Sequence, residues 1–207
     1  GGGPPLFVGG GGGGGPAADP PAAPGPGEHL TRTLELLEWF VPWEYGRATA
    51  VELTDPGATL AGRYVPAVRD PVGRLPSGGL VLGVGDAVVV NDPLTVQGAN
   101  SAAKCAASYL ASIVERGDEP FDADWMRTAF ERYWASARHV TRWTNTMLGP
   151  RSPHIRALID AAAGSQPVAD RIANGFDDPS DFDDYFYDAA SAGAYMSEAK
   201  VPAAGGT

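Results

Sequence analysis

The amino-acid sequence predicts an α/β chain, α+β-like as part of a larger fold, with a few strands and a helical C-terminal cap. Three observations predict this class. The continuous apolar run at 79–84, GLVLGV, is typical of a fully buried strand in a parallel or mixed sheet. Leucines three and four residues apart at 28–41 indicate an amphipathic helix. A longer pattern of the same period covers 122–148.

Glycine and proline dominate residues 1–27, which hold 12 of the 28 glycines and 7 of the 19 prolines. Such a segment buries too little apolar surface to offset its ordering entropy, so it is predicted to be disordered. The run from Gly9 to Gly15 contains the spacing of a dinucleotide fingerprint. The prolines that follow cannot form the helix that this fingerprint requires, so we interpret the run as low complexity.

Charge and cysteine content exclude several classes of protein. The net charge of -10 disfavours nucleic-acid binding, because phosphates bind basic surfaces. The one cysteine, Cys105, excludes an internal disulfide and a multi-cysteine zinc site, and is expected to be a small core residue. No apolar run reaches ~18 residues, and no basic residue precedes an apolar stretch at the N-terminus. We therefore expect a cytoplasmic protein with no nucleic-acid or membrane partner.

The elements follow in order along the chain. The helix at 28–41 carries its apolar face on Leu30, Leu34, Leu37 and Val41 and ends before Pro42. Short β-like pieces at 49–53, 59–60 and 63–68 predict two or three strands of a sheet whose earlier strands lie outside this chain. After the buried strand at 79–84, a glycine-bounded turn leads into a helix at 98–115.

The C-terminal half is predicted to be helical. Asp122 or Asp124 can cap the helix at 122–148, and shorter helices are expected at 152–163 and 168–172. The predicted buried face of the long helix comprises Trp125, Ala129, Tyr133, Trp134, Ala137, Val140, Thr144 and Met147.

The stretch at 177–188, DDPSDFDDYFYD, holds six aspartates and no basic residue. It is predicted to be a solvated turn with Phe182 and Phe186 pointing inward. A calcium loop is excluded by the spacing, because no glycine lies mid-loop and no glutamate closes it. Residues 197–207 are expected to be a frayed tail.

The segment GDAVVVNDPLTVQGAN, residues 85–100, has the chemistry that a flavin dinucleotide needs. A carboxylate at a strand end can accept hydrogen bonds from ribityl hydroxyls. Free amides at a helix N-terminus can bind the pyrophosphate or the developing charge at N1–C2=O of the ring. Glycine at the helix start lets the ring approach the backbone, and proline stiffens the loop. The candidate cofactor-binding residues are Gly85, Asp86, Pro93, Gly98, Ala99 and Asn100.

This segment resembles the second flavin-binding motif of p-hydroxybenzoate-hydroxylase-fold monooxygenases. Within that fold, the flanking sequence most resembles the oxygenase component of styrene/indole monooxygenases. The flanking segments that carry this resemblance include EHLTRTLELLEWFVPWEY, QGANSAAKCAASYL and ANGFDDP. The resemblance covers about residues 28–195. It implies the C-terminal portion of such a fold. The implied parts are a leader (1–27), the end of a substrate-binding domain (28–78), the C-terminal part of an FAD domain (79–117), a helical region (118–196) and a tail (197–207).

The chain departs from the pattern of this family in two places. Members usually carry glycine between Thr and Gln, where this chain has Val96, and a β-branched residue there can strain the loop. The family also binds the ADP half of FAD with an N-terminal βαβ unit, and nothing in this chain matches that unit. The second departure suggests a truncated product, a fragmentary sequence or one half of a split protein.

The resemblance implies two-component oxygenation. A separate flavin reductase supplies reduced FAD, and a flavin C4a-hydroperoxide transfers oxygen to a small aromatic alkene or indole. It also allows a homodimer. The cofactor carries the chemistry, which agrees with the lack of a catalytic triad or paired carboxylates, so no catalytic residue is assigned. Whether this chain is itself an enzyme stays open, because a non-catalytic remnant or a half-subunit would have the same sequence features.

The remaining arginines and histidines that could take part in catalysis are interpreted as structural or surface residues. Arg63 and Arg69, beside the flavin segment, are interpreted as structural rather than flavin-proximal. His139 is expected to be a packed or surface histidine on the long helix, and His29 and His154 lie near helix starts. None of the three has a partner visible in the sequence.

Overall fold

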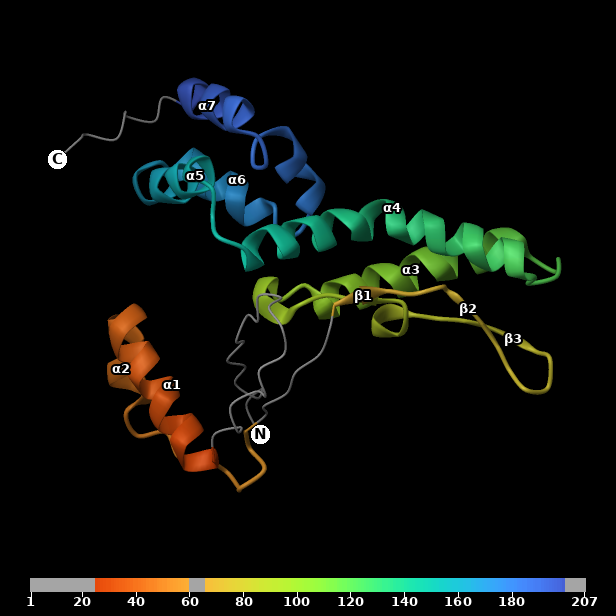
Figure 1. Cartoon of the computed structure of the whole chain (residues 1–207), viewed down its shortest axis with the longest axis horizontal. Coiled ribbons are helices and arrows are strands. Elements are labelled where there is room, and N and C mark those ends of the chain that lie inside the picture. Colours follow the sequence, from red (N-terminus) through yellow and green to blue (C-terminus); the bar gives the residue numbers. More distant parts are fainter. Residues whose placement is uncertain (1–24, 60–65, 200–207) are drawn as a thin grey trace. The chain divides into compact units, whose positions relative to one another are not determined.

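The computed structural model describes residues 25–59 and 66–199 and divides into two compact units, Gly1–Tyr64 and Val65–Thr207. The described residues are mostly helical, with four short strands in two antiparallel pairs (Figure 1). This agrees with the predicted class and with the predicted helical C-terminal cap. No helix in these ranges combines the length and the apolar composition needed to cross a membrane.

The first unit contains two helices, α1 (Pro26–Phe40) and α2 (Pro42–Ala48), which pack against each other. A proline begins each helix, where its missing N–H costs no hydrogen bond. The predicted leucine face of α1 is only half-buried, and His29 and Thr33 are its most buried residues.

The predicted strand at 49–53 is wrong, because Thr49 and Ala50 form a turn and residues 51–53 are irregular. An isolated β-like segment needs a pairing partner to form a strand, and this one has none among the described residues. The predicted strand at 59–60 is irregular at residue 59, and its second residue lies outside the described residues. Of the predicted strand at 63–68, residues 63–65 lie outside the described residues and Ala67–Val68 form a strand.

The second unit begins with β1 (Ala67–Val68), β2 (Val72–Arg74), β3 (Leu80–Leu82) and β4 (Val89–Val90). Strand β1 pairs with β4, and β2 pairs with β3. The expectation of a fully buried strand in a parallel or mixed sheet is therefore wrong. Strand β3 pairs in an antiparallel hairpin, and the side chain of Val81 is 43% exposed, because apolar packing covers one face of this hairpin only.

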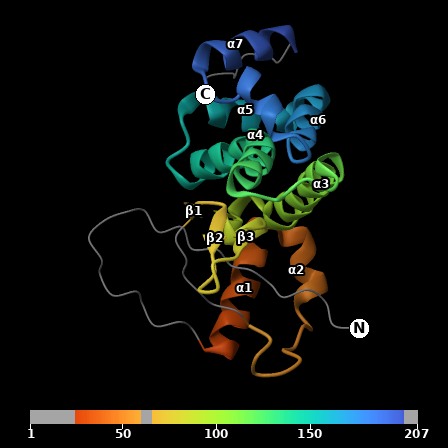
Figure 2. The same cartoon turned by 90° about the vertical axis from the view of Figure 1, so that its right-hand side faces the viewer.

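Two long helices, α3 (Gly98–Arg116) and α4 (Ala123–Leu148), pack side by side along the second unit (Figures 1 and 2). The carboxylate of Asp122 accepts a hydrogen bond of 2.8 Å from the N–H of Trp125, which confirms the predicted N-cap. The first hydrophobic core lies between these helices and β4. Its buried members are Val88, Val89, Cys105, Tyr109, Ala129, Phe130, Tyr133 and Ala137.

The C-terminal part surrounds a second core. It contains α5 (Pro153–Gly164), α6 (Gln166–Asn174), the 3-10 helix η3 (Pro179–Asp184) and α7 (Ala189–Glu198). The predicted frayed tail therefore begins too early, because α7 continues to Glu198, and residues 200–207 lie outside the described residues. The buried members of this core are Trp143, Ile155, Leu158, Phe182, Tyr185, Phe186 and Ala192, which confirms that Phe182 and Phe186 point inward.

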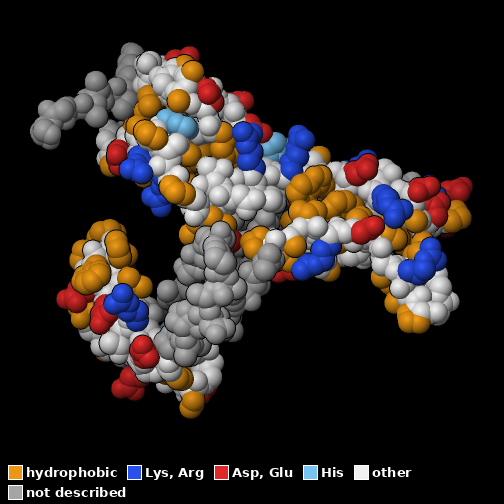
Figure 3. Space-filling view, viewed as in Figure 1, with side chains coloured by type: hydrophobic (Ala, Val, Ile, Leu, Met, Phe, Trp, Pro, Cys, Tyr) orange, Lys and Arg blue, Asp and Glu red, His pale blue; other side chains and the backbone are white. Residues whose placement is uncertain are grey.

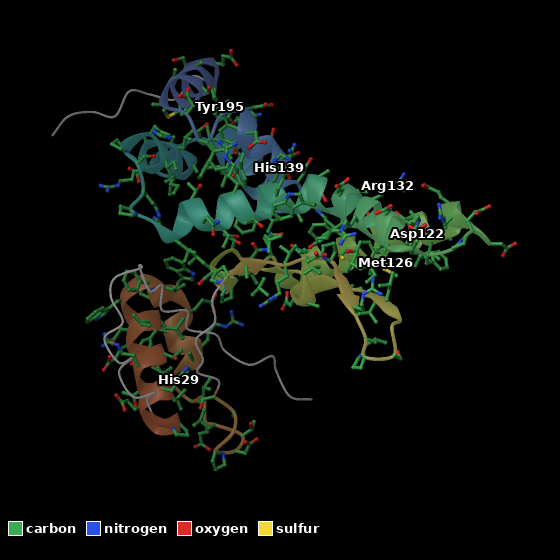
Figure 4. The ribbon with its side chains drawn as sticks, turned by 45° about the vertical axis from the view of Figure 1, so that its right-hand side comes forward. His29, Asp122, Met126, Arg132, His139 and Tyr195 are labelled. Atoms are coloured by element: carbon green, nitrogen blue, oxygen red, sulfur yellow. The ribbon has the colours of Figure 1, made fainter. Side chains whose placement is uncertain are left out.

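The acidic stretch is more than a solvated turn. Arg171 makes two hydrogen bonds, of 2.9 and 2.7 Å, to the carboxylate of Asp181. Asp183 accepts a 2.7 Å hydrogen bond from Arg142 and lies 2.7 Å from Nδ1 of His139, which faces this segment from α4 (Figure 4). These ion pairs fix the stretch on α4 and α6.

The buried face of α4 is broader than predicted. Five predicted positions are buried, whereas Trp125, Trp134 and Met147 are only partly buried. The residues that the prediction missed are Met126, Phe130 and Trp143. The helix serves two cores in succession, so its apolar face widens beyond a single stripe.

We predict that Gly175→Ala destabilises the second core. A Cβ at Gly175 would collide with the ring of Phe182, which is fully buried and cannot move away. Overpacking of this kind costs about 1–3 kcal/mol, measured as the free energy of unfolding in urea. The control is Gly193→Ala in α7, where a Cβ would meet nothing within 4 Å and alanine favours the helix. Equal stability of the two variants would contradict this packing.

Candidate functional site

The predicted site begins at a tight turn after β3. Residues Gly85–Ala87 form the 3-10 helix η1, and Gly85 has a φ of 56°, which glycine adopts without strain. The turn packs on α3, because a Cβ at Gly85 would lie 3.5 Å from the Cβ of Ala102. The Asp86 turn is therefore held beside the first turns of that helix.

Arg69 holds this turn from the other side. Its backbone N–H donates to the carbonyl of Val88 at 2.8 Å, and its guanidinium donates to the carbonyl of Asp86 at 3.0 Å. Arg69 therefore has the structural role that the sequence favoured, whereas Arg63 lies outside the described residues. The side chain of Asp86 is exposed, so its carboxylate is available to a ligand.

Three polar side chains anchor the loop between β4 and α3. The hydroxyl of Thr141 on α4 donates to Oδ1 of Asn91 at 2.9 Å. The hydroxyls of Thr95 and Thr144 share a buried hydrogen bond of 2.6 Å. Gln97, 3% exposed, donates from Nε2 to the carbonyl of Phe176 at 2.9 Å. The loop is thus fixed to α4 and to the segment that follows α6.

Pro93 begins a further 3-10 turn in this loop, η2 (Pro93–Thr95). The carboxylate of Asp92 caps it by accepting a 2.9 Å hydrogen bond from the N–H of Leu94. The proline ring and the cap both restrict the backbone, so the path of the loop toward α3 is narrowly defined.

Helix α3 begins with free amides. Gly98, Ala99 and Asn100 are exposed, and the first intrahelical hydrogen bond runs from the N–H of Ser101 to the carbonyl of Gln97. No side chain in the described part of the chain caps this end. A Cβ at Gly98 would meet no described atom within 4 Å, so the backbone of this residue is uncovered on that side. Such an end binds anionic groups.

Val96 lies two residues before the helix. Its φ of 56° and ψ of 26° are left-handed, and within residues 25–59 and 66–199 no other non-glycine residue has a positive φ. The left-handed region is strongly disfavoured for a β-branched residue. The position where the sequence departs from glycine is therefore the strained position of the loop.

The tyrosine hydroxyls and the cysteine thiol next to the candidate site are not arranged as a nucleophile. Tyr109 donates from its hydroxyl to the carbonyl of Gly83 at 3.1 Å, which ties the end of β3 to α3. Burial raises the pKa of Tyr109, and burial raises the pKa of Tyr133 to about 12. Both tyrosines therefore stay protonated at neutral pH. Cys105 between them is fully buried, as expected for a small core residue.

The structure places the predicted site residues on one continuous stretch around the start of α3. Asp86 and Gly85 lie on the turn beside this helix, Pro93 lies on the anchored loop, and Gly98 to Asn100 form the helix end. Their role toward a cofactor stays a prediction. No cluster of metal-ligating side chains occurs within the described ranges.

Sequence reasoning missed the residues that hold the loop, Asn91, Thr95 and Gln97. Their partners lie 49 to 79 residues away in the sequence, so no local spacing points to them. It also missed the partner of His139, the carboxylate of Asp183, while His154 lies 3.2 Å from the hydroxyl of Ser152.

We predict a strong coupling between the hydroxyls of Thr95 and Thr144. Thr95→Val or Thr144→Val alone leaves a buried hydroxyl unpaired and costs about 1–3 kcal/mol, whereas the double variant removes both and costs less than the sum. Urea unfolding of all four proteins measures the coupling. Thr128→Val, on an exposed turn of α4, is the control. Additive effects would contradict the shared bond.

We predict that Val96→Gly stabilises the second unit. Glycine adopts the same left-handed conformation without the Cβ clash, which removes a cost of about 1–2 kcal/mol, whereas the greater backbone entropy of glycine in the unfolded chain offsets about 0.5–1 kcal/mol of that gain. The thermal midpoint should rise by a few degrees. Val84→Gly is the matched control, because Val84 is also exposed but has an extended backbone, so it should lose stability. A lower midpoint for Val96→Gly would show that the loop depends on valine.

Comparison with known proteins points to one group of enzymes. The chain is similar to a styrene monooxygenase StyA from Pseudomonas sp, at 31% identity over 147 residues that cover 67% of this chain and 34% of the relative. It is also similar to styrene monooxygenase StyA from Pseudomonas fluorescens, at 30% identity over 123 residues, 58% of this chain and 29% of that relative. No family profile matches the chain. The chain thus has distant, partial similarity to styrene monooxygenases and spans about a third of the length of these relatives.

Proposed function

We propose that this chain provides the flavin-ring-binding part of an FAD-dependent monooxygenase that oxygenates small aromatic alkenes of the styrene or indole kind. A separate flavin reductase is the expected source of reduced FAD. The support is the similarity to styrene monooxygenases together with the arrangement around the start of α3. The observation that carries the proposal is the uncapped, open helix end at Gly98.

The residues at this end fit a flavin. An isoalloxazine ring needs a flat approach to the backbone, and the space beside Gly98 is open. The negative charge of a reduced ring, or of a pyrophosphate, needs N–H donors, which Gly98, Ala99 and Asn100 present without a competing side-chain cap. The ribityl hydroxyls need an acceptor, and the exposed carboxylate of Asp86 lies on the turn packed beside the same helix.

In this proposal each residue has a binding or orienting role. The amides of residues 98–100 stabilise negative charge, and the carboxylate of Asp86 orients the ribityl chain. Pro93 and the bond between Thr95 and Thr144 keep the loop in one path, so that the amides need no rearrangement when charge develops. When bound, FAD supplies the activation of O2 and the transfer of one oxygen atom to the substrate.

A second candidate is a remnant that binds no flavin and forms no product. Val96 favours it, because valine adds a Cβ to the approach path of the ring at a position of positive φ, where glycine would leave that path open. A third candidate is a half-subunit that completes its flavin site with a separate chain. Flavin binding separates the remnant from the other two.

We predict that the full chain quenches FAD fluorescence with a dissociation constant above the micromolar range, because it holds only the ring side of the site. Asp86→Ala should weaken binding about ten- to a hundredfold by removing a charged acceptor. Gly98→Val should weaken it at least as much by filling the open approach, whereas Gly149→Val, also in open space, is the control.

Two results would contradict this assignment. Unchanged affinity in both Asp86→Ala and Gly98→Val would place any flavin elsewhere on the chain. If FAD fluorescence is not quenched even at high protein concentration, and Val96→Gly does not restore quenching, the result would favour the remnant.

A further inference from the structure

We propose that a buried water molecule binds between α3, α4 and the segment 176–178, and that it ties the first two turns of α3 to this segment. The site is a cavity of about 30 Å³ whose lining residues belong to the second unit. A bound water needs roughly 10–15 Å³ of such space, so the cavity has room for one or two waters and for no larger ligand. The inference goes beyond the proposed function and holds whether or not the chain binds flavin.

Two buried side chains that line the cavity carry hydroxyls with no hydrogen-bond partner among the described residues. They are Ser101 on α3 and Tyr133 on α4. Both side chains are more than nine-tenths buried, because Ser101 is 6% exposed and Tyr133 is 1% exposed. Buried polar groups in native proteins are almost always paired with another protein group or with an ordered water. The two hydroxyls therefore indicate a polar ligand in the cavity that they share.

The lining offers both donors and acceptors, which is the combination that water satisfies. The hydroxyl of Ser136 donates to the carbonyl of Tyr133 at 2.9 Å, so its oxygen presents only lone pairs to the cavity. The carboxylate of Asp178 is likewise an acceptor, whereas the hydroxyls of Ser101 and Tyr133 can donate. Water donates as well as accepts and typically makes about three hydrogen bonds, so it matches this mixed set.

A simple ion matches the cavity less well. Lys104 and Asp178 line its exposed rim with opposite charges, so each repels the ion that the other attracts. A hydrogen bond from the side chain of Ser180 lowers the pKa of Asp178, so the carboxylate stays charged at neutral pH. Figure 3 also shows basic and acidic side chains interspersed on the visible face, rather than one patch of a single sign. These charges favour a neutral ligand.

The position of Ser101 on α3 explains what the water does. The side chain of Gln97 donates to the carbonyl of Phe176 at 2.9 Å, and the ammonium of Lys104 donates to the carbonyl of Asp177. Positions 97, 101 and 104 are four and three residues apart, so they share one face of the helix. Ser101 lies between the two direct contacts and faces the cavity that the residue after Asp177 also lines. A water there adds a third link between α3 and consecutive residues of the segment 176–178.

The direct experiment is a crystal structure of the full chain, grown with sodium bromide, at a resolution that shows ordered waters. We expect a water within hydrogen-bond distance of the hydroxyl of Ser101 or of Tyr133, and no anomalous signal in the cavity. Absence of density in the cavity would overturn the proposal. A bromide peak there would identify the ligand as an anion and would overturn it as well.

Ser101→Ala and Ser108→Ala form a matched pair for a test in solution. Both serines lie on α3 and carry buried hydroxyls without a partner among the described residues, but of the two Ser101 alone lines the cavity. Alanine favours the helix equally at both positions, so the difference between the variants isolates the water. We expect the thermal midpoint of Ser101→Ala to lie at least about 2 °C below that of Ser108→Ala.

A second pair repeats the comparison on tyrosines. Tyr133→Phe removes a hydroxyl from the cavity lining, whereas Tyr185→Phe removes an equally buried, unpartnered hydroxyl from the second core. We expect the larger fall of the thermal midpoint for Tyr133→Phe. Removing a hydroxyl that has no partner stabilises a protein, because the cost of burying it disappears. A midpoint of Ser101→Ala at or above that of Ser108→Ala, or of Tyr133→Phe at or above that of Tyr185→Phe, would therefore overturn the proposal.

Discussion

Among the elements of the described residues, helix α4 is the one that both hydrophobic cores share. Its first two thirds pack against α3 around Tyr133, and its last third packs against the C-terminal helices around Trp143. The candidate site depends on the same helix, because Thr141 and Thr144 anchor the loop that leads into α3. A shift of α4 along its axis would therefore move the loop and both cores together.

The anchoring explains how an exposed helix end keeps a defined position. The amides of Gly98 to Asn100 lie at the surface, but the residue before them, Gln97, is buried and bonded to the carbonyl of Phe176. Buried polar side chains of this kind are costly unless every partner is in place, so they select one arrangement. Within that arrangement Val96 has a disfavoured backbone conformation, which the neighbouring contacts impose.

Much of the helical structure could be predicted from the sequence, because periodicity and caps are local. The long helix with its Asp122 cap and the inward Phe182 are of this kind. The strands are harder to predict, because GLVLGV is apolar enough for a buried strand, but within the described part of the chain this strand pairs with β2 alone. The site residues could be named from a local motif, whereas Thr95 and Gln97 bind residues far along the chain. The ion pairs of the acidic stretch cannot be predicted from local sequence for the same reason, since Arg171 and Arg142 reach it from other helices.

The position of Cys105 makes this side chain a natural probe of local opening in the first core. The thiol is the sole one in the chain and is fully buried between α3 and α4. A thiol reagent can reach it only while the two helices separate. The rate at which a reagent modifies this thiol therefore measures how often the first core opens. Amide hydrogen exchange reports the same kind of opening, but the thiol reports it at one known position and needs no substitution.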